Sequence, residues 1–447
     1  MELGKTYKFK IDGYDMNGLG VAKQDGIVVF IEKALAGETV IAEITNLHKK
    51  YAFAKTIRVL EESQDRQVSP CEYYEACGGC DLLHMKYDVE CLVKESKVQN
   101  AFKKINGLSE LKINPIIKND NIMGYRNKVM IPFGYDEDDY VIYGFYEKLS
   151  HELVSIDKCL ISNDETNKVV EFVRRYLSVM NVKIYNEQTH KGIFRSLMVR
   201  NNYKGEMMLV LVITEYYDFS GLIDYIKSDF PLVKSIYLNI NSEKTNVMLS
   251  NEYIHLYGDE ILIEDILGLK FNVSAASFMQ VNHNNAEKLY LEAFRMANLN
   301  PNMNVIDAYC GMGSITLNIA KHVNKVYGIE IVPEAIENAN KNKELNKIEN
   351  AIFICGKCEE EIKKLVSLNN IDVIFFDPPR KGCDEEFLKT VVEMNIPKIV
   401  YISCNISSAC RDINYLNKYG YEVKEVTPVD LFSRTSHVET VCLLAKK

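Results

Sequence analysis

One cysteine stands where a nucleophile would be presented to a ligand. The run 399–402 is short and apolar, which predicts a buried parallel strand, and Ser403-Cys404-Asn405 ends that strand. In open α/β sheets the carboxyl ends of the strands line the ligand crevice, so the Cys404 thiol would face whatever binds there. The competing interpretation is a small buried hydrophobic residue, because most free cysteines belong to a core.

Three further cysteines have a spacing that suits a metal or a cluster. Cys71, Cys77 and Cys80 follow C-x5-C-x2-C, and the glycines between the last two let the backbone fold tightly around one centre. A fourth soft ligand is required, for which Cys159 is the first candidate and Cys91, on a predicted helix, the second. Four thiolates could hold zinc or a 4Fe-4S cluster, and the spacing alone does not decide between them.

Composition limits the class of protein. The chain has 447 residues, 47% of them hydrophobic and 26% charged, which fits a globular protein of about two to four domains. No apolar run approaches the roughly 20 residues that span a bilayer, and the N-terminus does not resemble a signal peptide. We therefore expect a cytoplasmic protein without a membrane partner, in which the 12 cysteines serve metal or catalysis instead of disulfides. The net charge of −9 means that RNA contact would come from local basic patches.

The elements that must position these cysteines fall into three predicted domains. Residues 1–62 alternate apolar and polar positions between turns that contain glycine, which predicts a small β-barrel. Residues 63–265 hold the cysteine-rich segment, a helix at 88–106 with the catalytic domain as a candidate packing partner, and a mainly antiparallel sheet with a helix near 165–179. Residues 266–447 alternate strictly between strands and helices, which is typical of a doubly wound, mostly parallel α/β sheet.

Two sets of side chains outside the α/β domain are candidates for RNA contact. Basic residues near strand ends of the barrel could bind phosphates, and they are Lys49, Lys50, Lys55 and Arg58. Basic and aromatic residues also interleave on the central sheet, namely Arg126, Lys128, Arg195 and Arg200 with Tyr125, Phe133, Tyr143 and Phe194. Such a face could take phosphates and unstacked bases, although a solvated face with half-buried aromatic rings explains the same pattern.

The first strand–helix unit of the α/β domain carries a nucleotide-type turn. A strand ends in Asp307, Gly311 and Gly313 allow a tight turn with close approach of a ligand, and a helix begins at Ser314. The second strand ends in the acidic residue Glu330. This D-x-x-C-G-x-G pattern followed by the acid resembles class I S-adenosylmethionine (SAM) methyltransferases, in which the acid binds both ribose hydroxyls.

Two more strand ends complete the predicted active site. The fourth strand ends in FFDPPRKG, a stiff loop with Asp377 and Arg380. Amino-directed adenine methyltransferases carry an aromatic residue where this chain has Arg380, so amino-group chemistry is disfavoured. In the class I sheet the last strand is antiparallel and lies beside the fifth. Its first residue, Glu439, would therefore lie one inter-strand spacing, about 4.8 Å, from the strand end that carries Cys404.

Together these motifs resemble the RNA uracil-5-methyltransferases, most closely the bacterial enzymes that act on 23S rRNA. A TRAM-like barrel, C-x5-C-x2-C, SFMQVN at 277–282, DAYCGMG, GIE, DPPRKG, SCN and HVET occur in the family's order. The resemblance implies that Cys404 is the nucleophile, Glu439 the base, and Asp377 a further active-site group. It implies SAM-site positions at Gln280, Tyr309, Gly311, Gly313, Ser314, Glu330 and Asp377. It also implies that Cys71, Cys77, Cys80 and Cys159 bind a 4Fe-4S cluster, which favours iron and sulfur over zinc.

The resemblance also implies a reaction. Cys404 adds to C6 of a flipped uracil in 23S rRNA, C5 takes the methyl group, and Glu439 removes the C5 proton to give 5-methyluridine. A free thiol has a pKa near 8.5, so we expect the local field to activate Cys404. Two departures put loop rigidity in doubt: Ile406 stands where the family commonly has proline, and Ser433-Arg434 where Pro-His is frequent.

Three other functions fit parts of the same pattern. A tRNA uracil-5-methyltransferase of the same family would share most of these motifs. A cytosine-5 RNA methyltransferase also uses a cysteine, but it would be expected to show a different pair of cysteine loops. A non-catalytic iron–sulfur RNA-binding protein would need neither Cys404 nor Glu439. We expect a monomer with no obligate protein partner.

Overall fold

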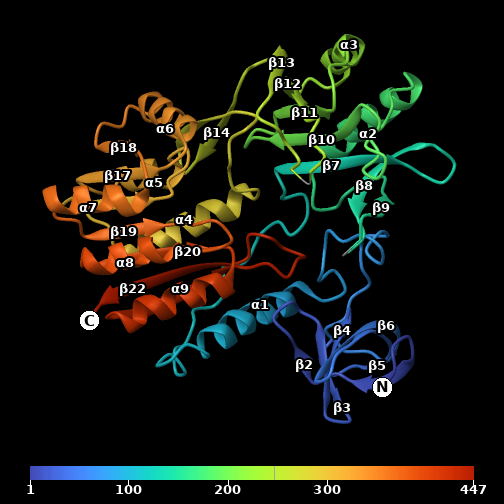
Figure 1. Ribbon diagram of the computed structural model, residues 1–447, viewed down its shortest axis with the longest axis horizontal. Coiled ribbons are helices and arrows are strands. Elements are labelled where there is room, and N and C mark those ends of the chain that lie inside the picture. Colours follow the sequence, from blue (N-terminus) through green and yellow to red (C-terminus); the bar gives the residue numbers. More distant parts are fainter. Residues whose placement is uncertain (149, 246) are drawn as a thin grey trace.

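The computed structural model describes residues 1–148, 150–245 and 247–447, and its N-terminal part is a barrel-like sheet at the lower right of Figure 1. Its strands are β1 (Thr6–Lys10), β2 (Gly13–Tyr14), β3 (Gly20–Gln24), β4 (Ile27–Glu32), β5 (Thr39–Leu47) and β6 (Tyr51–Glu61). They form one six-stranded sheet in the order β1-β5-β6-β4-β3-β2. Alternate residues point inward, so the sheet encloses an apolar core with Phe9, Val29 and Ile44 at its centre.

The central part is a seven-stranded sheet in the order β13-β12-β11-β10-β7-β8-β9. Its strands are β7 (Lys128–Tyr135), β8 (Val141–Tyr146), β9 (Leu153–Ser155), β10 (Phe194–Asn201), β11 (Met207–Ile213), β12 (Val233–Ile240) and β13 (Tyr253–Gly258). The sheet is mainly antiparallel, as predicted, and β11 and β12 form a parallel pair that is joined through helix α3 (Ser220–Asp229). The predicted helix near 165–179 is α2 (Asp164–Val179), capped by the Asn163 side chain.

The aromatic residues predicted to stack RNA bases on this sheet belong to its core instead. Phe133, Tyr143 and Phe194 are at most 5% exposed and pack in the same cluster as the apolar side of α2. The Arg195 guanidinium donates to the backbone oxygens of Asn241 and Glu243. The prediction of an RNA-stacking face here is therefore wrong, because helices cover the side of the sheet on which the rings lie.

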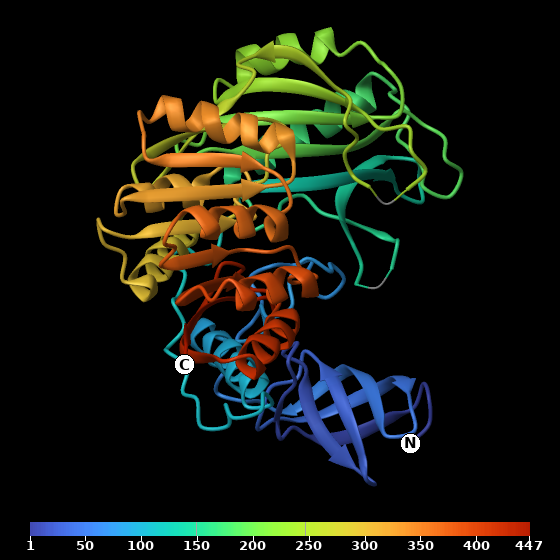
Figure 2. The same ribbon diagram turned by 60° about the vertical axis from the view of Figure 1, so that its left-hand side comes forward.

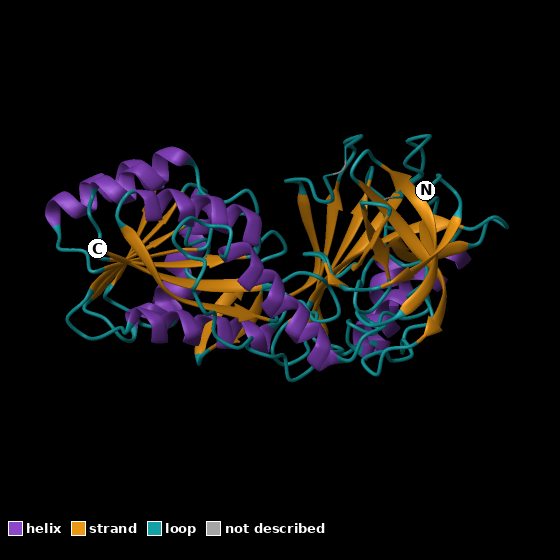
Figure 3. Cartoon of the chain, turned by 90° about the horizontal axis from the view of Figure 1, so that it is seen from below, coloured by secondary structure: helices purple, strands orange, loops and turns teal. Residues whose placement is uncertain are grey.

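The C-terminal part is a seven-stranded sheet with helices on both faces (Figure 3) in the order β18-β17-β16-β19-β20-β22-β21. Its strands are β16 (Asn304–Ala308), β17 (Lys325–Glu330), β18 (Ala351–Cys355), β19 (Val373–Phe376), β20 (Lys398–Ser403), β21 (Tyr421–Val429) and β22 (Glu439–Lys446). Its helices are α4 (His283–Ala297), α5 (Ser314–Ala320), α6 (Pro333–Leu345), α7 (Cys358–Leu368), α8 (Glu385–Glu393) and α9 (Ile406–Lys418). All pairs are parallel except those of β22, which runs antiparallel to both β20 and β21. This is the class I topology that the sequence predicts.

Two segments that precede the C-terminal sheet in the sequence pack against the C-terminal domain. Helix α1 (Tyr87–Phe102) follows the cysteine-rich segment but lies beside α9 of the C-terminal domain in Figures 1 and 2, and its Val98 and Phe102 are in that domain's core. The boundary expected between residues 265 and 266 falls inside the hairpin of β14 (Leu262–Ile266) and β15 (Leu269–Val273). Phe271 and Val273 of this hairpin pack in the C-terminal core. None of the helices in the described ranges has the length and apolarity that a membrane crossing needs.

Candidate active site

The strand register brings Cys404 and Glu439 to the same edge of the C-terminal sheet. Strand β20 ends at Ser403, which pairs with Thr440 in the antiparallel strand β22. Cys404 directly follows Ser403, and Glu439 directly precedes Thr440. Because the two strands are antiparallel, Cys404 and Glu439 lie at the same end of the strand pair. Burial raises the pKa of the Cys404 thiol, and the charge of Glu439 is the next cause that raises it. The predicted juxtaposition of a thiol and a carboxyl group is therefore present.

Two carboxyl groups act on this thiol, the buried Glu439 and the half-buried Asp377. Glu439 is 2% exposed, and burial together with the charge of Asp377 raises its pKa well above the ordinary range, while Arg380 lowers it. Burial also raises the pKa of Asp377 to about 7. A carboxyl group whose pKa lies near or above neutrality can hold a proton taken from a substrate, which is what a general base must do.

Cys404 is not activated in this arrangement. Burial, followed by the charges of Glu439 and Asp377, raises its pKa to about 11, and Arg380 is the group that lowers it. The expectation that the local field activates this thiol is therefore wrong for the structure. The physical reason is that a poorly solvated site opposes a negative charge on sulfur, and any charge on the two neighbouring carboxyl groups opposes it further.

The loop that follows Cys404 is held by hydrogen bonds and by a buried apolar side chain. The Asn405 side chain caps α9 by accepting a hydrogen bond from the Ser407 backbone N–H at 3.0 Å. Its amide also donates to the backbone oxygen of Arg380 at 3.0 Å, which ties the loop to the one after β19. Ile406 is 3% exposed and packs in the domain core. At the first departure from the expected family pattern, Ile406, the loop is therefore fixed by the Asn405 cap and by a buried apolar side chain instead of a proline.

The glycine turn and Glu330 lie side by side at the ends of β16 and β17. Gly313 has a φ of 85° at the N-terminus of α5, and a Cβ there would lie 2.6 Å from the Phe353 ring. The Glu330 carboxylate accepts from the Gly311 backbone N–H at 3.2 Å and from the Ile331 N–H at 2.8 Å. This places a carboxylate against the turn, where a ribose would meet it.

The remaining predicted cofactor positions surround the same edge. Tyr309 has a φ of 64° directly after β16, and Ser314 begins α5. Gln280 is 9% exposed, and its backbone oxygen accepts from the Asn127 side-chain amide at 3.2 Å. That bond reaches from the central part of the chain, so the loop carrying Gln280 is held between two domains.

The four cysteines predicted to bind a cluster are electrostatic neighbours. Burial raises the pKa of Cys71, Cys77 and Cys80, and the charge of Cys159 raises all three further. Cys91 is instead 2% exposed in the core between α1 and the C-terminal domain, which excludes it as the fourth ligand. Within residues 1–148, 150–245 and 247–447, no group of His, Cys, Asp or Glu is already arranged as a ligand set for a metal ion. The donor set fits a soft metal centre in its chemistry, and the thiols are gathered without being in ligating geometry.

Comparison with known proteins identifies the family. The model of the tRNA (uracil-5-)-methyltransferase family matches residues 86–447, and the TRAM domain model matches residues 1–57. The chain belongs to this family. An uncharacterized RNA methyltransferase of Clostridium acetobutylicum is 43% identical over 98% of this chain and 97% of its own length. Another from Staphylococcus aureus is 40% identical over 96% of both chains.

A solved structure supports the fold. It is the Pyrococcus abyssi tRNA (uracil-54, C5)-methyltransferase in complex with S-adenosyl-L-homocysteine, with a TM-score of 0.79 and 24% identity. The match covers 98% of this chain and 100% of that one. The chain is thus an RNA uracil-5-methyltransferase with a class I methyltransferase fold and a TRAM domain.

Sequence reasoning missed two side chains that shape the methyltransferase site. From the sequence, Arg380 was used only as an argument against amino-group methylation. In the structure, its charge lowers the pKa of both Cys404 and Glu439. Tyr290, on the unpredicted helix α4, is 4% exposed and its hydroxyl lies 3.2 Å from Ser314 Oγ. The helical spacing of buried residues in α4 is the signal that could have found it.

The pKa of Cys404 predicts how this thiol reacts. Alkylation by iodoacetamide, followed at the Cys404 peptide by mass spectrometry, is expected to be slow at pH 7 and to accelerate until the pH reaches about 11. Arg380→Gln removes the charge that lowers this pKa, so alkylation at any given pH should become slower. Lys381→Gln, at an exposed neighbouring position, is the control and should leave the profile unchanged. A wild-type rate that is already maximal at pH 7 would contradict the assignment.

Proposed function

We propose that this methyltransferase converts uridine in 23S rRNA to 5-methyluridine through a covalent adduct on Cys404. The observation that carries the proposal is the convergence of Cys404 and Glu439 at the ends of the adjacent strands β20 and β22. C5 of uracil is a poor nucleophile until a group adds to C6, and a thiolate is the side chain suited to that addition. A carboxylate is then needed to take the proton from C5.

The roles of the residues follow the order of bond changes. Cys404 first loses its thiol proton to solvent and then adds as thiolate to C6, which turns C5 into an enolate carbon. When bound, SAM supplies an electrophilic methyl group, which C5 takes up. Glu439 then removes the C5 proton, the C5–C6 double bond re-forms, and the Cys404 sulfur leaves. Asp377, whose pKa lies near 7, orients the uracil edge or the cofactor amine.

The carboxyl edge of β16 and β17 would hold the SAM molecule. Glu330 would bind the ribose hydroxyls, and the turn of Gly311 and Gly313 would admit the cofactor to the backbone at the start of α5. Tyr309, Ser314 and Gln280 line the same edge. The target uridine must leave its stack to reach Cys404, because no intact helix can enter this crevice.

We further propose that Cys71, Cys77, Cys80 and Cys159 hold a 4Fe-4S cluster. Support comes from their mutual proximity and from the soft, all-thiolate donor set. Such a cluster would cross-link the cysteine-rich segment to the chain near β9. Iron and sulfide in equal amounts in anaerobically purified protein would support the cluster, whereas zinc in their place would overturn it.

The preference for 23S rRNA rests on the combination of the TRAM domain with the cysteine motif. In the barrel, Lys49, Lys50, Lys55 and Arg58 are all exposed and available to phosphates. The second candidate is tRNA, since the family description and the Pyrococcus abyssi structure both name it. We propose that the enzyme acts as a monomer on either RNA.

The substrate is tested by mass mapping of 5-methyluridine in RNA from a deletion strain, together with methylation of transcripts by the purified enzyme. We expect 5-methyluridine to disappear from 23S rRNA, to persist in tRNA, and to be restored by the purified protein on an rRNA fragment. Methylation of tRNA alone would overturn the choice of rRNA. If the purified enzyme forms 5-methyluridine in neither the rRNA fragment nor the tRNA transcript, the proposed chemistry would be overturned.

A further inference from the structure

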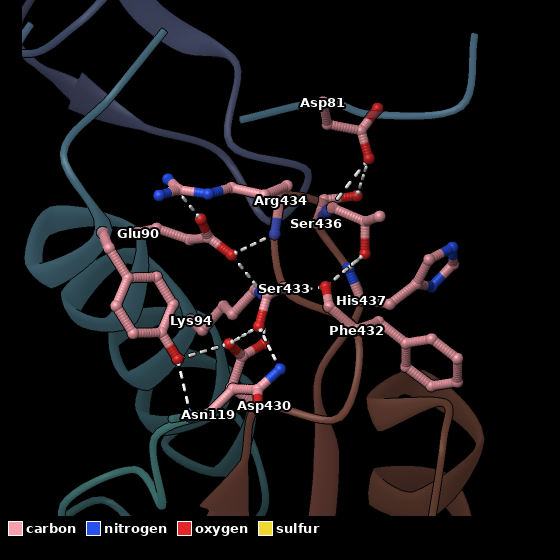
Figure 4. A network of polar contacts seen from close by, with 12 residues as sticks. Asp81, Glu90, Lys94, Asn119, Asp430, Phe432, Ser433, Arg434, Ser436 and His437 are labelled. Carbon is pink, nitrogen blue, oxygen red and sulfur yellow. Dashed lines mark hydrogen bonds and ion pairs between the residues drawn. The ribbon is translucent and has the colours of Figure 1, made fainter. Parts of the chain in front are cut away.

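The loop between β21 and β22, residues 430–438, leads directly to Glu439. Val429 and Glu439 are paired across the two strands, so the loop leaves and returns at the carboxyl group itself. Ser433-Arg434 within it is the second departure from the sequences of many relatives. Figure 4 shows that polar side chains from helix α1 and from the cysteine-rich segment surround this loop.

From one side, the loop is held by a buried ionic cluster. The Lys94 ammonium donates to Glu90 Oε1 at 2.8 Å and to Asp430 Oδ1 at 2.6 Å, and all three side chains are at most 1% exposed. The Arg434 backbone N–H donates to the same Glu90 carboxylate at 2.7 Å. A φ of 70° at Arg434 is sustained by these contacts. The loop is therefore fixed by charge pairing and by hydrogen bonds to Glu90.

From the other side, the loop is held by Asp81, which directly follows Cys80. Its Oδ2 atom accepts from the Ser436 backbone N–H at 2.9 Å and from the Ser436 hydroxyl at 3.0 Å. The Asp81 and Leu82 backbone N–H groups donate to the Arg434 oxygen at 2.9 and 3.1 Å. Figure 4 shows the Asp81 carboxylate pointing at Ser436, only a few residues before Glu439.

We propose that Asp81 is a positioning residue for Glu439, so that the cysteine-rich segment controls the proton-removal step of methylation. The inference rests on the proposed function. Cys404 is carried by β20 and the start of α9, and Asp81 makes no hydrogen bond to either. Loss of the Asp81–Ser436 contact should therefore leave addition and methyl transfer intact and slow only the last step.

A slowed last step has a readout that general destabilisation does not produce. With uridine-containing RNA, the methylated adduct on Cys404 should accumulate, because its C5 proton is removed slowly. With 5-fluorouridine RNA no proton is present at C5, so the adduct should form at the wild-type rate in every folded variant. Denaturing gels of enzyme with labelled RNA measure both adducts, and 5-methyluridine release measures turnover.

The variants are Asp81→Ala and Ser436→Ala, which cut the same contact from its two sides. Both should accumulate the uridine adduct, and for Asp81→Ala turnover should fall about 10²-fold, the usual effect of a misplacement near 1 Å. Ser436→Ala lies outside the cysteine segment and retains one of the two hydrogen bonds, so its effect should be smaller. Lys148→Ala is the matched control, because Lys148 pairs with the other oxygen of Asp81 and does not contact the loop.

The outcomes separate this inference from the function on which it depends. If Asp81→Ala and Ser436→Ala lose uridine adduct, fluorouridine adduct and product in parallel, or retain wild-type turnover, Asp81 does not position the base. If wild-type enzyme and Glu439→Gln form no adduct with either RNA, the covalent mechanism itself fails. Metal content measured on each variant shows whether the cysteine-rich segment is intact. If Asp81→Ala has lost metal, the result for Ser436→Ala decides whether the Asp81–Ser436 contact positions Glu439.

Discussion

Cys404→Ala is expected to give neither a covalent RNA adduct nor 5-methyluridine, whereas Glu439→Gln is expected to trap the adduct. The two residues act at opposite ends of the reaction, so their removal should stop it at different points. Without the thiol nothing adds to C6, and product formation should fall to background. Without the carboxylate the C5 proton stays, and release should fall by about 10²- to 10⁴-fold, the usual contribution of a general base.

The measurement is a denaturing gel of enzyme, SAM and labelled RNA, with 5-methyluridine quantified in parallel. Cys410→Ala is the matched control, since Cys410 is a half-buried cysteine within α9 to which no step of the reaction is assigned. Turnover that persists in Cys404→Ala would remove the proposed mechanism. A Glu439→Gln enzyme that releases product at the wild-type rate would assign the base to another group, with Asp377 the nearest candidate.

Lys94→Met is expected to lower the free energy of unfolding by about 3–5 kcal/mol, because it leaves the Asp430 carboxyl group buried without its cation and Glu90 with the Arg434 guanidinium alone. Lys94 is 1% exposed and the two acids are fully buried, so water cannot replace the lost charge. Urea unfolding at pH 7 measures the change. Lys118→Met is the control, because its pair with Asp88 on the exposed side of α1 should contribute at most about 1 kcal/mol.

This loss of stability should depend on pH in a defined direction. Burial already raises the pKa of Glu90, and Lys94 is the first group that lowers it, so the substitution raises that pKa further. A carboxyl group with a raised folded-state pKa destabilises the protein above its unfolded-state pKa and not below it. The difference between Lys94→Met and wild type should therefore shrink as the pH falls towards 4. A difference that is constant with pH would show that the lost packing, not the lost charge, matters.

Much of the fold and of the site was readable from the sequence, because the signals were local. Strict alternation of strands and helices after residue 266 predicted the doubly wound sheet, and strand-end motifs placed Asp307, Glu330, Asp377 and Cys404. Glu330 is the last residue of β17, Asp377 and Cys404 directly follow β19 and β20, and Asp307 is the last residue but one of β16. Strand identity alone therefore fixes their place at the carboxyl edge. Glu439 required one further rule, the antiparallel last strand, which the register confirms.

Only the tertiary structure decided the environment of these groups. The raised pKa of Cys404 depends on burial and on two carboxyl groups from other strands. The central aromatic rings are buried because helices cover the face of the sheet on which they lie. An alternating sequence pattern does not show which face of a sheet is covered.

The sequence by itself determined the class I sheet and the order of its motifs, and it supplied the candidates for the reacting side chains, since each follows from residues that are neighbours in the chain. Folding decided what holds those side chains in place. The contacts of Lys94 with Asp430 and of Asp81 with Ser436 join positions more than 300 residues apart, and no local spacing encodes them. A buried charge requires a partner close to it in space, and that partner can be distant in the sequence. Which distant segment supplies the partner is set by the packed structure.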